Sequence, residues 1–228
     1  MFTLALVARK GGSGKTTLGV HLALAAYLRG WRTLMADADP QRSATEALSA
    51  RRTLGPERVA LAGSRLYSAQ MDAVRRGIDV MVIDTSAGVA EDNAAAIVLA
   101  DLCVLVVRPT YLDLAAAIES VAMIRRLKKA VLLVVNQAPH PRDGVEPPLM
   151  RRALRALAIL GQPIAPTVIR SRLIYQTALE TGRSAEEADQ PAAAREIAEL
   201  WAYIRHQAFP RDAADMMLSA SLAQGRAY

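Results

Sequence analysis

Short apolar runs alternate along the chain with longer segments in which apolar residues recur every three or four positions. Runs such as FTLALV at 2–7 and LCVLVV at 102–107 contain almost no polar residue. This alternation is typical of βαβ units and predicts a mostly parallel sheet. Strands that lack polar alternation have both faces covered by helices. The pattern therefore predicts an α/β fold, a three-layer α/β/α sandwich.

The same pattern predicts where the elements lie. Strands are expected at 2–7, 33–36, 79–83, 102–107, 131–135 and 165–169, with a weaker one at 59–62. Helices are expected at 15–29, 44–52, 66–76, 92–99, 114–127, 148–160, 173–180 and 192–206. Two capping-box patterns, Ser43 with Glu46 and Ser184 with Glu187, mark helix starts. We expect a single domain over 1–208, followed over 209–228 by a tail that is a short helix or disordered.

Composition narrows the class of protein. With 228 residues and 52% hydrophobic content, the chain can bury the core of one ordinary domain. Its apolar runs are far shorter than the roughly 18 residues of a membrane span, and no cationic start leads into a signal-like stretch. We therefore expect a soluble cytoplasmic protein without stable membrane association. Cys103 is the only cysteine, which excludes an internal disulfide and a multi-cysteine metal or iron–sulfur site.

The net charge of +6 suggests an acidic partner such as nucleic acid or a membrane surface, and this charge is unevenly distributed. Between Arg125 and Arg172 there are ten basic residues and two acidic ones, so this window holds more than the whole surplus. One interpretation is a solvated face in a chain that prefers arginine to lysine. The other is a DNA-binding surface, whose candidate residues are Arg151, Arg152, Arg155, Arg170 and Arg172.

The stretch ARKGGSGKTT at 8–17 joins the first predicted strand to the first predicted helix. Glycines in such a loop let backbone N–H groups turn toward phosphate oxygens, and the helix N-terminus adds its positive dipole. Lys15 is placed to reach the β- and γ-phosphates, and Thr16 to ligate Mg²⁺. The stretch departs from the plain P-loop pattern at Arg9, where glycine is required, and it adds a second lysine, Lys10.

With these two lysines, KGGSGKTT resembles the deviant Walker A motif of the ParA/MinD family of P-loop ATPases. The resemblance implies a P-loop NTPase fold with ATP and Mg²⁺ as cofactors. It also implies that Lys10 contacts the phosphates of the nucleotide in the opposite subunit, so that ATP holds a homodimer together. The nucleotide contacts implied in the loop are Gly11, Gly12, Ser13, Gly14, Lys15, Thr16 and Thr17.

Three further segments resemble motifs of the same family. In DADPQ, the resemblance makes Asp39 the residue that orients or activates the attacking water. In VMVIDTSAG, Asp84 looks like the Walker B residue that holds Mg²⁺ through water, with 85–88 as switch II. In LLVVNQAP, Asn136 would contact adenine. All are expected at strand C-termini, where ligands bind in open α/β sheets. The catalytic set implied is Lys10, Lys15 and Asp39.

The segments RPTYLDLAAA and VIRSRLIYQTALETG look like those of small ParA proteins of plasmid and chromosome partition. This resemblance implies a slow ATPase that alternates between an ATP-bound dimer and an ADP-bound or apo monomer. The dimer would bind double-stranded DNA without sequence preference and associate with the nucleoid. A centromere-binding, ParB-like adaptor would stimulate hydrolysis.

Other members of the superfamily provide alternatives. A ParA-like ATPase can instead position a protein assembly or a conjugation complex, and the sequence does not separate these cargoes. A MinD-like protein would cycle on membranes through a basic amphipathic tail, whereas AADMMLSASLAQGRAY contains Arg226 as its only cation. A biosynthetic amidotransferase or synthetase is disfavoured by Lys10 together with the D-x-D-P-Q segment.

Overall fold

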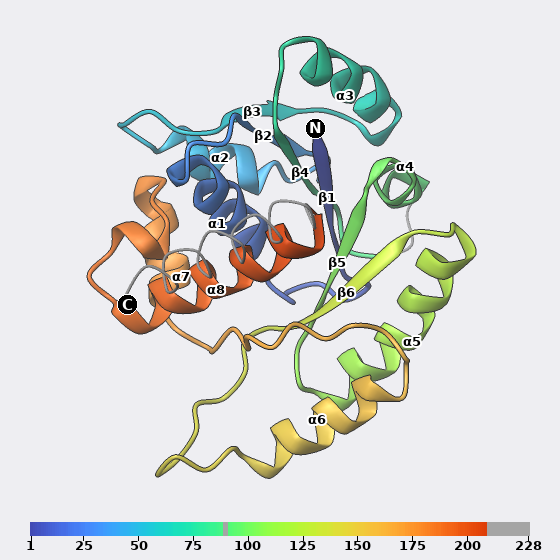
Figure 1. The fold of residues 1–228 in the computed structure, drawn as a ribbon, viewed down its shortest axis with the longest axis vertical. Coiled ribbons are helices and arrows are strands. Elements are labelled where there is room, and N and C mark those ends of the chain that lie inside the picture. The colour runs from blue at the N-terminus through green and yellow to red at the C-terminus, as the bar shows by residue number, and fades with distance from the viewer. Residues whose placement is uncertain (89–90, 209–228) are drawn as a thin grey trace, which may run out of the picture.

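The computed structural model describes residues 1–88 and 91–208 (Figure 1). At its centre is a six-stranded parallel sheet with the strand order β3-β2-β4-β1-β5-β6. The strands are β1 (Phe2–Val7), β2 (Thr33–Asp37), β3 (Glu57–Ala60), β4 (Val80–Asp84), β5 (Leu102–Val107) and β6 (Ala130–Val135). The predicted parallel sheet is confirmed.

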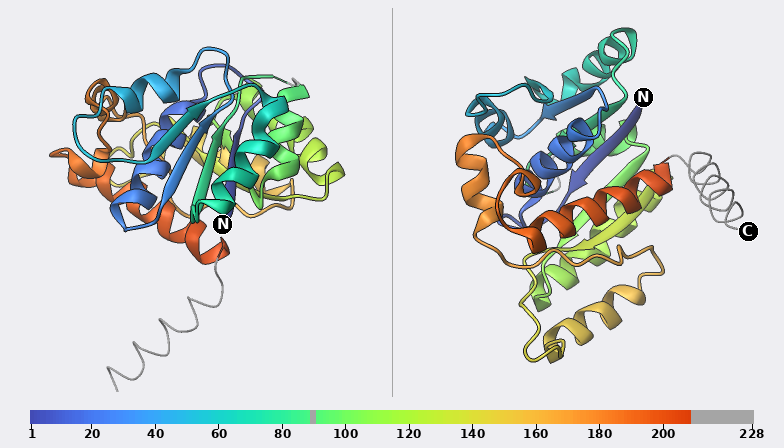
Figure 2. Two further views of the ribbon diagram at one scale, coloured as in Figure 1. Left: turned by 90° about the horizontal axis from the view of Figure 1, so that it is seen from above. Right: turned by 60° about the vertical axis from the view of Figure 1, so that its left-hand side comes forward.

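Helices cover both faces of the sheet, as Figures 1 and 2 show. One face carries α1 (Lys15–Leu28), α2 (Ser43–Ser49), α7 (Ile174–Thr177) and α8 (Pro191–Ala208). The other carries α3 (Leu66–Arg75), α4 (Glu91–Leu99), α5 (Tyr111–Arg126) and α6 (Pro148–Ala158). Successive strand residues enter opposite cores: Leu4 and Leu6 of β1 pack on the α1 side, and Ala5 and Val7 on the α5 side. The three-layer prediction is therefore correct.

The strand predicted after β6 is not a regular strand. In this segment the Ala165 N–H donates to the Leu133 carbonyl at 2.8 Å. The next such bond runs from the Ile169 N–H to the Val135 carbonyl at 2.9 Å. An advance of two residues along β6, from Leu133 to Val135, therefore corresponds to an advance of four residues along the segment, from Ala165 to Ile169. Pro166 lies between these bonds and has no N–H to continue the ladder, so the chain bulges there.

One of the two predicted capping boxes is absent. Helix α2 begins at Ser43 itself, because Arg42 has a left-handed φ of 55° and turns the chain directly into the helix. No side chain caps this start, so the predicted pair of Ser43 with Glu46 is wrong. Ser184 and Glu187 do form the predicted capping box, at the 3₁₀ helix η3 (Ala185–Glu187).

Short 3₁₀ helices replace or extend parts of the predicted elements. The helix predicted at 173–180 is divided between α7 and η2 (Ala178–Thr181), and η1 (Gly63–Arg65) precedes α3. Within the described ranges, no helix has the length and apolar content needed to cross a membrane. The tail predicted at 209–228 lies outside the described residues, as does the segment on which the MinD-like alternative depends.

The parallel arrangement brings several polar strand ends to one edge of the sheet. In the register of the central strands, Asp37 at the end of β2 pairs with Asp84 at the end of β4. Asp84 in turn pairs with Leu6, one residue before the end of β1. The loops that follow β1, β2 and β4 therefore begin side by side, and the candidate site lies where they meet.

Candidate nucleotide-binding site

The loop at 8–14 leaves β1 and enters α1 at this edge. Gly12 and Gly14 have φ values of 72° and 86°, a left-handed backbone that glycine adopts without strain. A Cβ at Gly14 would also lie 2.4 Å from Nδ2 of Asn136. That nitrogen donates to the Ser13 carbonyl at 2.7 Å, and Nε2 of Gln137 donates to the Gly12 carbonyl at 2.9 Å. The protein thus fixes the loop through its carbonyl groups, whereas phosphate binding uses the N–H groups.

Lys15 is the first residue of α1 and lies at the base of the loop. Only 6% of its surface is exposed. Burial lowers the pKa of its ammonium group, while the carboxylates of Asp84 and Asp39 act in the opposite direction. A phosphate beside Lys15 would stabilise the charged form, so a buried lysine at this position suits an anionic ligand.

Thr16 and Asp84 form a pair beneath the loop. Thr16 Oγ1 donates to Oδ2 of Asp84 at 2.7 Å. Among the described residues, the other carboxylate oxygen and the Ser13 hydroxyl are buried without a hydrogen-bond partner. Burial, together with the nearby Asp37 and Asp39 carboxylates, raises the pKa of Asp84 to about 7. A hard cation would take hydroxyl and carboxylate oxygens as ligands and favour the charged carboxylate, so these residues fit Mg²⁺.

The two aspartates of DADPQ have different surroundings. Asp37 is fully buried, and its carboxylate accepts the N–H groups of Asp39 at 3.2 Å and Thr45 at 2.8 Å. It therefore shapes the turn between β2 and α2. Asp39 is only partly buried, and its Oδ1 accepts the N–H of Gln41 at 2.9 Å. The second aspartate is the one that can reach a ligand.

A cavity of about 520 Å³ opens between the loop and this turn. Its walls include the loop glycines, Lys15, Thr16, Asp39 and Ser86. The Ser86 carbonyl accepts Nδ2 of Asn93 at 3.1 Å, which ties the segment after β4 to α4. A cation, a helix start and a carboxylate around one cavity suit a phosphate chain with its metal ion and a water molecule.

The family model of the CobQ/CobB/MinD/ParA nucleotide binding domain matches residues 4–185. The chain belongs to this family. The match spans the loop, the polar strand ends and the cavity between them. The ParA/MinD resemblance and the P-loop fold predicted from the sequence are therefore confirmed.

Two curated relatives cover most of the chain. Maintenance of carboxysome distribution protein A of Halothiobacillus neapolitanus is 30% identical over an alignment of 196 positions that covers 80% of this chain and 86% of the relative. Protein IncC of Escherichia coli is 27% identical over an alignment of 230 positions that covers 80% of this chain and 62% of IncC.

Solved structures of this family have the same fold. Cyanothece McdA, solved as a complex with ATP, aligns with a TM-score of 0.74 over 88% of this chain and 95% of its own, at 16% identity. The cell division ATPase MinD of Pyrococcus furiosus aligns with a TM-score of 0.75 over 91% of this chain and 99% of its own, at 20% identity. A MinD from Pyrococcus horikoshii was solved with Mg-ADP. The predicted cofactors, ATP and Mg²⁺, are confirmed at the level of the family.

The structure separates the two lysines of the motif. Lys10 is half-buried and does not line the large cavity. It makes no hydrogen bond or ion pair with any other residue in the described ranges. Its neighbour Arg9, which replaces the usual glycine, forms an ion pair with Glu119 of α5. The contact of Lys10 with a second subunit's nucleotide stays a prediction.

Asn136 lies at the end of β6, as predicted, and its amide nitrogen is used to hold the loop. It also lines a second cavity of about 100 Å³ beside the first. Its contact with adenine stays a prediction. The adjacent Gln137 holds the loop in the same way but was missed by the sequence reasoning, although its position directly after Asn136 was a usable signal.

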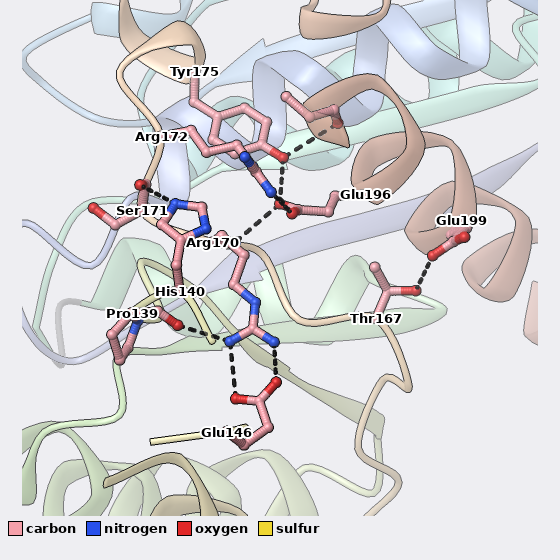
Figure 3. A network of polar contacts seen from close by, with 11 residues as sticks. Pro139, His140, Glu146, Thr167, Arg170, Ser171, Arg172, Tyr175, Glu196 and Glu199 are labelled. Carbon is pink, nitrogen blue, oxygen red and sulfur yellow. Dashed lines mark hydrogen bonds and ion pairs between the residues drawn. The ribbon is translucent and has the colours of Figure 1, made fainter. Parts of the chain in front are cut away.

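The five arginines predicted to bind DNA fall into two groups. Arg151, Arg152 and Arg155 are exposed on α6 and form no ion pair with the described residues. Arg170 and Arg172 are instead paired with carboxylates on other segments, as Figure 3 shows. Both residues were counted in the surplus of basic residues between 125 and 172, but in the structure Glu146 and Glu196 neutralise their charges. DNA contact stays a prediction for all five residues, and only the α6 group has unbalanced charge.

A further arginine lies against the loop. The guanidinium of Arg108 donates to the Asp113 carboxylate at 3.0 Å and 3.2 Å, and its third nitrogen would lie 3.6 Å from a Cβ at Gly12. Both residues fall within RPTYLDLAAA, a segment that the sequence reasoning used only for its resemblance. Arg108 is thus a cation held against the phosphate loop by Asp113, and sequence reasoning did not assign it.

Proposed function

We propose that the protein is a slow, Mg²⁺-dependent ATPase that dimerises on binding ATP and positions a cargo on DNA. The observation that carries this proposal is the placement of Lys15, the Thr16–Asp84 pair and Asp39 around one cavity. The loop N–H groups and Lys15 would bind the phosphates, and Thr16 and Asp84 would hold Mg²⁺. The metal ion would stabilise negative charge on the phosphates, while Asp39 orients the water.

The surroundings of Lys10 support the dimer. The small cavity that Lys10 lines includes one acidic residue, Asp113, whose carboxylate is already used by Arg108 and Thr110. The charge of Lys10 therefore has no function within the protomer that the described contacts reveal. A phosphate brought by a second subunit would supply the missing partner.

ATP-dependent dimerisation tests this proposal. In the Asp39→Ala background, which should retain ATP, light scattering with MgATP should give twice the 24.5 kDa protomer mass. Adding Lys10→Gln should return the mass to that of the monomer, because each nucleotide site in the dimer would lose the lysine charge that the other subunit supplies. Lys128→Gln, a lysine exposed outside the site, is the control. A Lys10→Gln protein that dimerises as well as its parent would refute the role of Lys10 in the partner's site.

For the cargo, we favour a protein assembly over a replicon. This choice rests on the 30% identity with a relative named for carboxysome distribution, over 80% of this chain. Plasmid or chromosome partition is the second candidate, supported by the resemblance of RPTYLDLAAA and VIRSRLIYQTALETG to small ParA proteins. Deletion of the gene distinguishes them: clustered or misplaced protein assemblies support the first, and loss of a plasmid or chromosome supports the second.

The adaptor protein that links the ATPase to its cargo would differ between these two candidate cargoes. A centromere-binding, ParB-like protein is expected for partition, and an assembly-bound protein for the favoured cargo. In either case the adaptor should stimulate hydrolysis, so the ATPase rate in its presence identifies it. Nucleoid association follows from DNA binding and belongs to the same proposal.

The DNA surface of this proposal is the exposed face of α6. Eight of the ten basic residues between Arg125 and Arg172 make no ion pair with the described residues. They lie on the end of α5, the turn after it, the loop before α6 and α6 itself. The two helices pack side by side at one end of the molecule (Figure 1). Dimerisation would double these contacts, which explains how ATP can control DNA binding.

Charge reversal on α6 should weaken DNA binding strongly. In the ATP-bound dimer, Arg152→Glu with Arg155→Glu removes up to four phosphate contacts, and each should contribute about 0.9 to the slope of log K against log salt. We expect random-sequence DNA to bind about 100-fold more weakly near physiological salt, with a slope lower by up to about 3.6. Mobility shifts across a salt series measure both quantities.

The matched control is Arg65→Glu with Arg75→Glu, at the α3 end of the molecule in Figure 1. It makes the same change in net charge far from α6 and should leave most of the affinity. Equal losses in both double variants would indicate a general charge effect rather than a surface on α6. No DNA binding by the unaltered dimer would instead favour a membrane or a protein scaffold as the surface on which the protein acts.

A further inference from the structure

The smaller cavity continues the nucleotide site away from the phosphate loop. Its volume is about 100 Å³, and it shares Gly14 and Thr17 with the large cavity. One wall is formed by the segment 169–176, which lies beside Asn136 and Gln137 and is joined to the chain after β6 by the parallel bridge of Arg170 with Ala138. A ligand with its phosphates on the loop would therefore place the rest of its structure here.

Three residues of the wall formed by 169–176 bond to a single carboxylate from a distant part of the chain. Glu196 of α8 accepts the Arg170 N–H at 2.9 Å and the Tyr175 hydroxyl at 2.7 Å. Its other oxygen accepts Nη2 of Arg172 at 2.7 Å. Figure 3 shows these groups converging on Glu196 from one side. Only 13% of the Glu196 side chain is exposed, so water cannot readily replace these donors.

The side chain of Arg170 ties this wall to the chain after β6 a second time. Its guanidinium forms an ion pair with Glu146 and donates to the Pro139 carbonyl at 2.8 Å (Figure 3). Both acceptors belong to the chain that continues from Asn136 and Gln137. The backbone of Arg170 is held by Glu196 while its side chain holds the loop after β6, so this residue links Glu196 to both segments that line the cavity.

The lining of the cavity suits a flat heterocyclic ring. Leu18, Ile169 and Ile197 provide apolar surface. Asn136 uses its Nδ2 on the Ser13 carbonyl, and its Oδ1 has no hydrogen bond to the described residues, so this oxygen can accept an exocyclic amino group. Given the proposed nucleotide function, the chemical class that fits is an amino-substituted purine.

We propose that Glu196 is the positioning residue of this base pocket. It does not line the cavity itself, but acts through Arg170, Arg172 and Tyr175. Its replacement by glutamine keeps the shape of the side chain and removes the charge. It also introduces an NH₂ group among three donors, where one of them must lose its acceptor. The wall should then loosen without disturbing the phosphate loop, which Asn136 and Gln137 hold separately.

The test compares ligands with and without a base, in the full-length protein and without turnover. Displacement of a fluorescent ADP analogue gives affinities for ADP and for inorganic tripolyphosphate. Glu196→Gln should weaken ADP about 10-fold, the effect of losing one hydrogen bond to a charged group, and leave tripolyphosphate unchanged. Tyr175→Phe, which removes one of the donors, should weaken ADP less and in the same selective way.

The matched control is Glu199→Gln, three residues along α8, whose carboxylate accepts, among the residues that the structure describes, only the Thr167 hydroxyl, at 3.4 Å. It makes the same charge change and should bind both ligands normally. Equal losses of ADP and tripolyphosphate, or unchanged ADP affinity, would overturn the role of Glu196. If Glu196→Gln does not fold by circular dichroism, Tyr175→Phe decides between these outcomes. An unaltered protein that binds neither ligand would overturn the nucleotide function itself, which is a distinct result.

Discussion

Replacing Lys15 with alanine should lower the affinity for MgATP at least about 100-fold, the largest binding effect expected in this protein. Only 6% of the Lys15 surface is exposed, so its ammonium faces the cavity and the protein rather than bulk water. Such a charge interacts strongly with a phosphate because little solvent screens the pair. Alanine leaves the phosphate oxygens without this partner and leaves a gap at the base of the loop.

Equilibrium binding of a fluorescent ATP analogue measures this loss. Lys129→Ala removes a half-buried lysine outside the site and should bind ATP normally. Thermal unfolding of both variants without nucleotide separates loss of binding from loss of fold. ATP affinity within about threefold of the unaltered protein would show that the phosphates do not lie beside Lys15, and the proposed site would then be wrong.

The strands with apolar residues on both faces could be read from the sequence. The bounds of β1 and β5 coincide with the predicted 2–7 and 102–107. The edge strand β3 begins at Glu57, two residues before the predicted 59–62. The prediction missed this start because the first residues of β3 are exposed and charged. Edge strands often carry such residues, which prevent pairing with other chains, and apolar runs therefore do not mark their bounds.

The nucleotide loop was predictable for a different reason. Its chemistry is concentrated in consecutive residues, from Lys10 to Thr17, so spacing alone identifies it. Asp39 and Asp84 could be added because one lies just after a buried strand and the other ends one, and the ends of parallel strands meet at one edge. These residues come together in the structure because the sheet places them, and that sheet was itself predictable.

The network around Glu196 could not be predicted in this way. Glu196 lies 24 residues after Arg172 in the chain, and nothing in the local sequence pairs them. The same limitation explains why Arg170 and Arg172 were grouped with the arginines of α6. A count of charges along a window includes every arginine equally, whereas the structure shows which of them already have a carboxylate partner.

Replacing Asp39 with alanine should have the opposite effect to replacing Lys15: it should abolish most ATP turnover and preserve ATP binding. We expect the hydrolysis rate to fall about 100-fold or more, the usual contribution of a residue that positions a proton acceptor or water. Asp39 is suited to this function because it lies in the cavity wall and is only partly buried, with one oxygen bonded to the Gln41 N–H. The fully buried Asp37 supports the turn instead, so the turn should survive the change at Asp39.

Single-turnover phosphate release and equilibrium ATP binding, measured on the same preparations, test this separation of roles. Asp189→Ala, an exposed carboxylate before α8, is the control and should leave both quantities unchanged. Removing a carboxylate near the phosphates also removes a repulsion, so the Asp39→Ala protein should hold ATP at least as tightly as the unaltered protein. If Asp39→Ala loses ATP as severely as Lys15→Ala does, the two residues share one binding role. Asp39 would then have no separate part in hydrolysis.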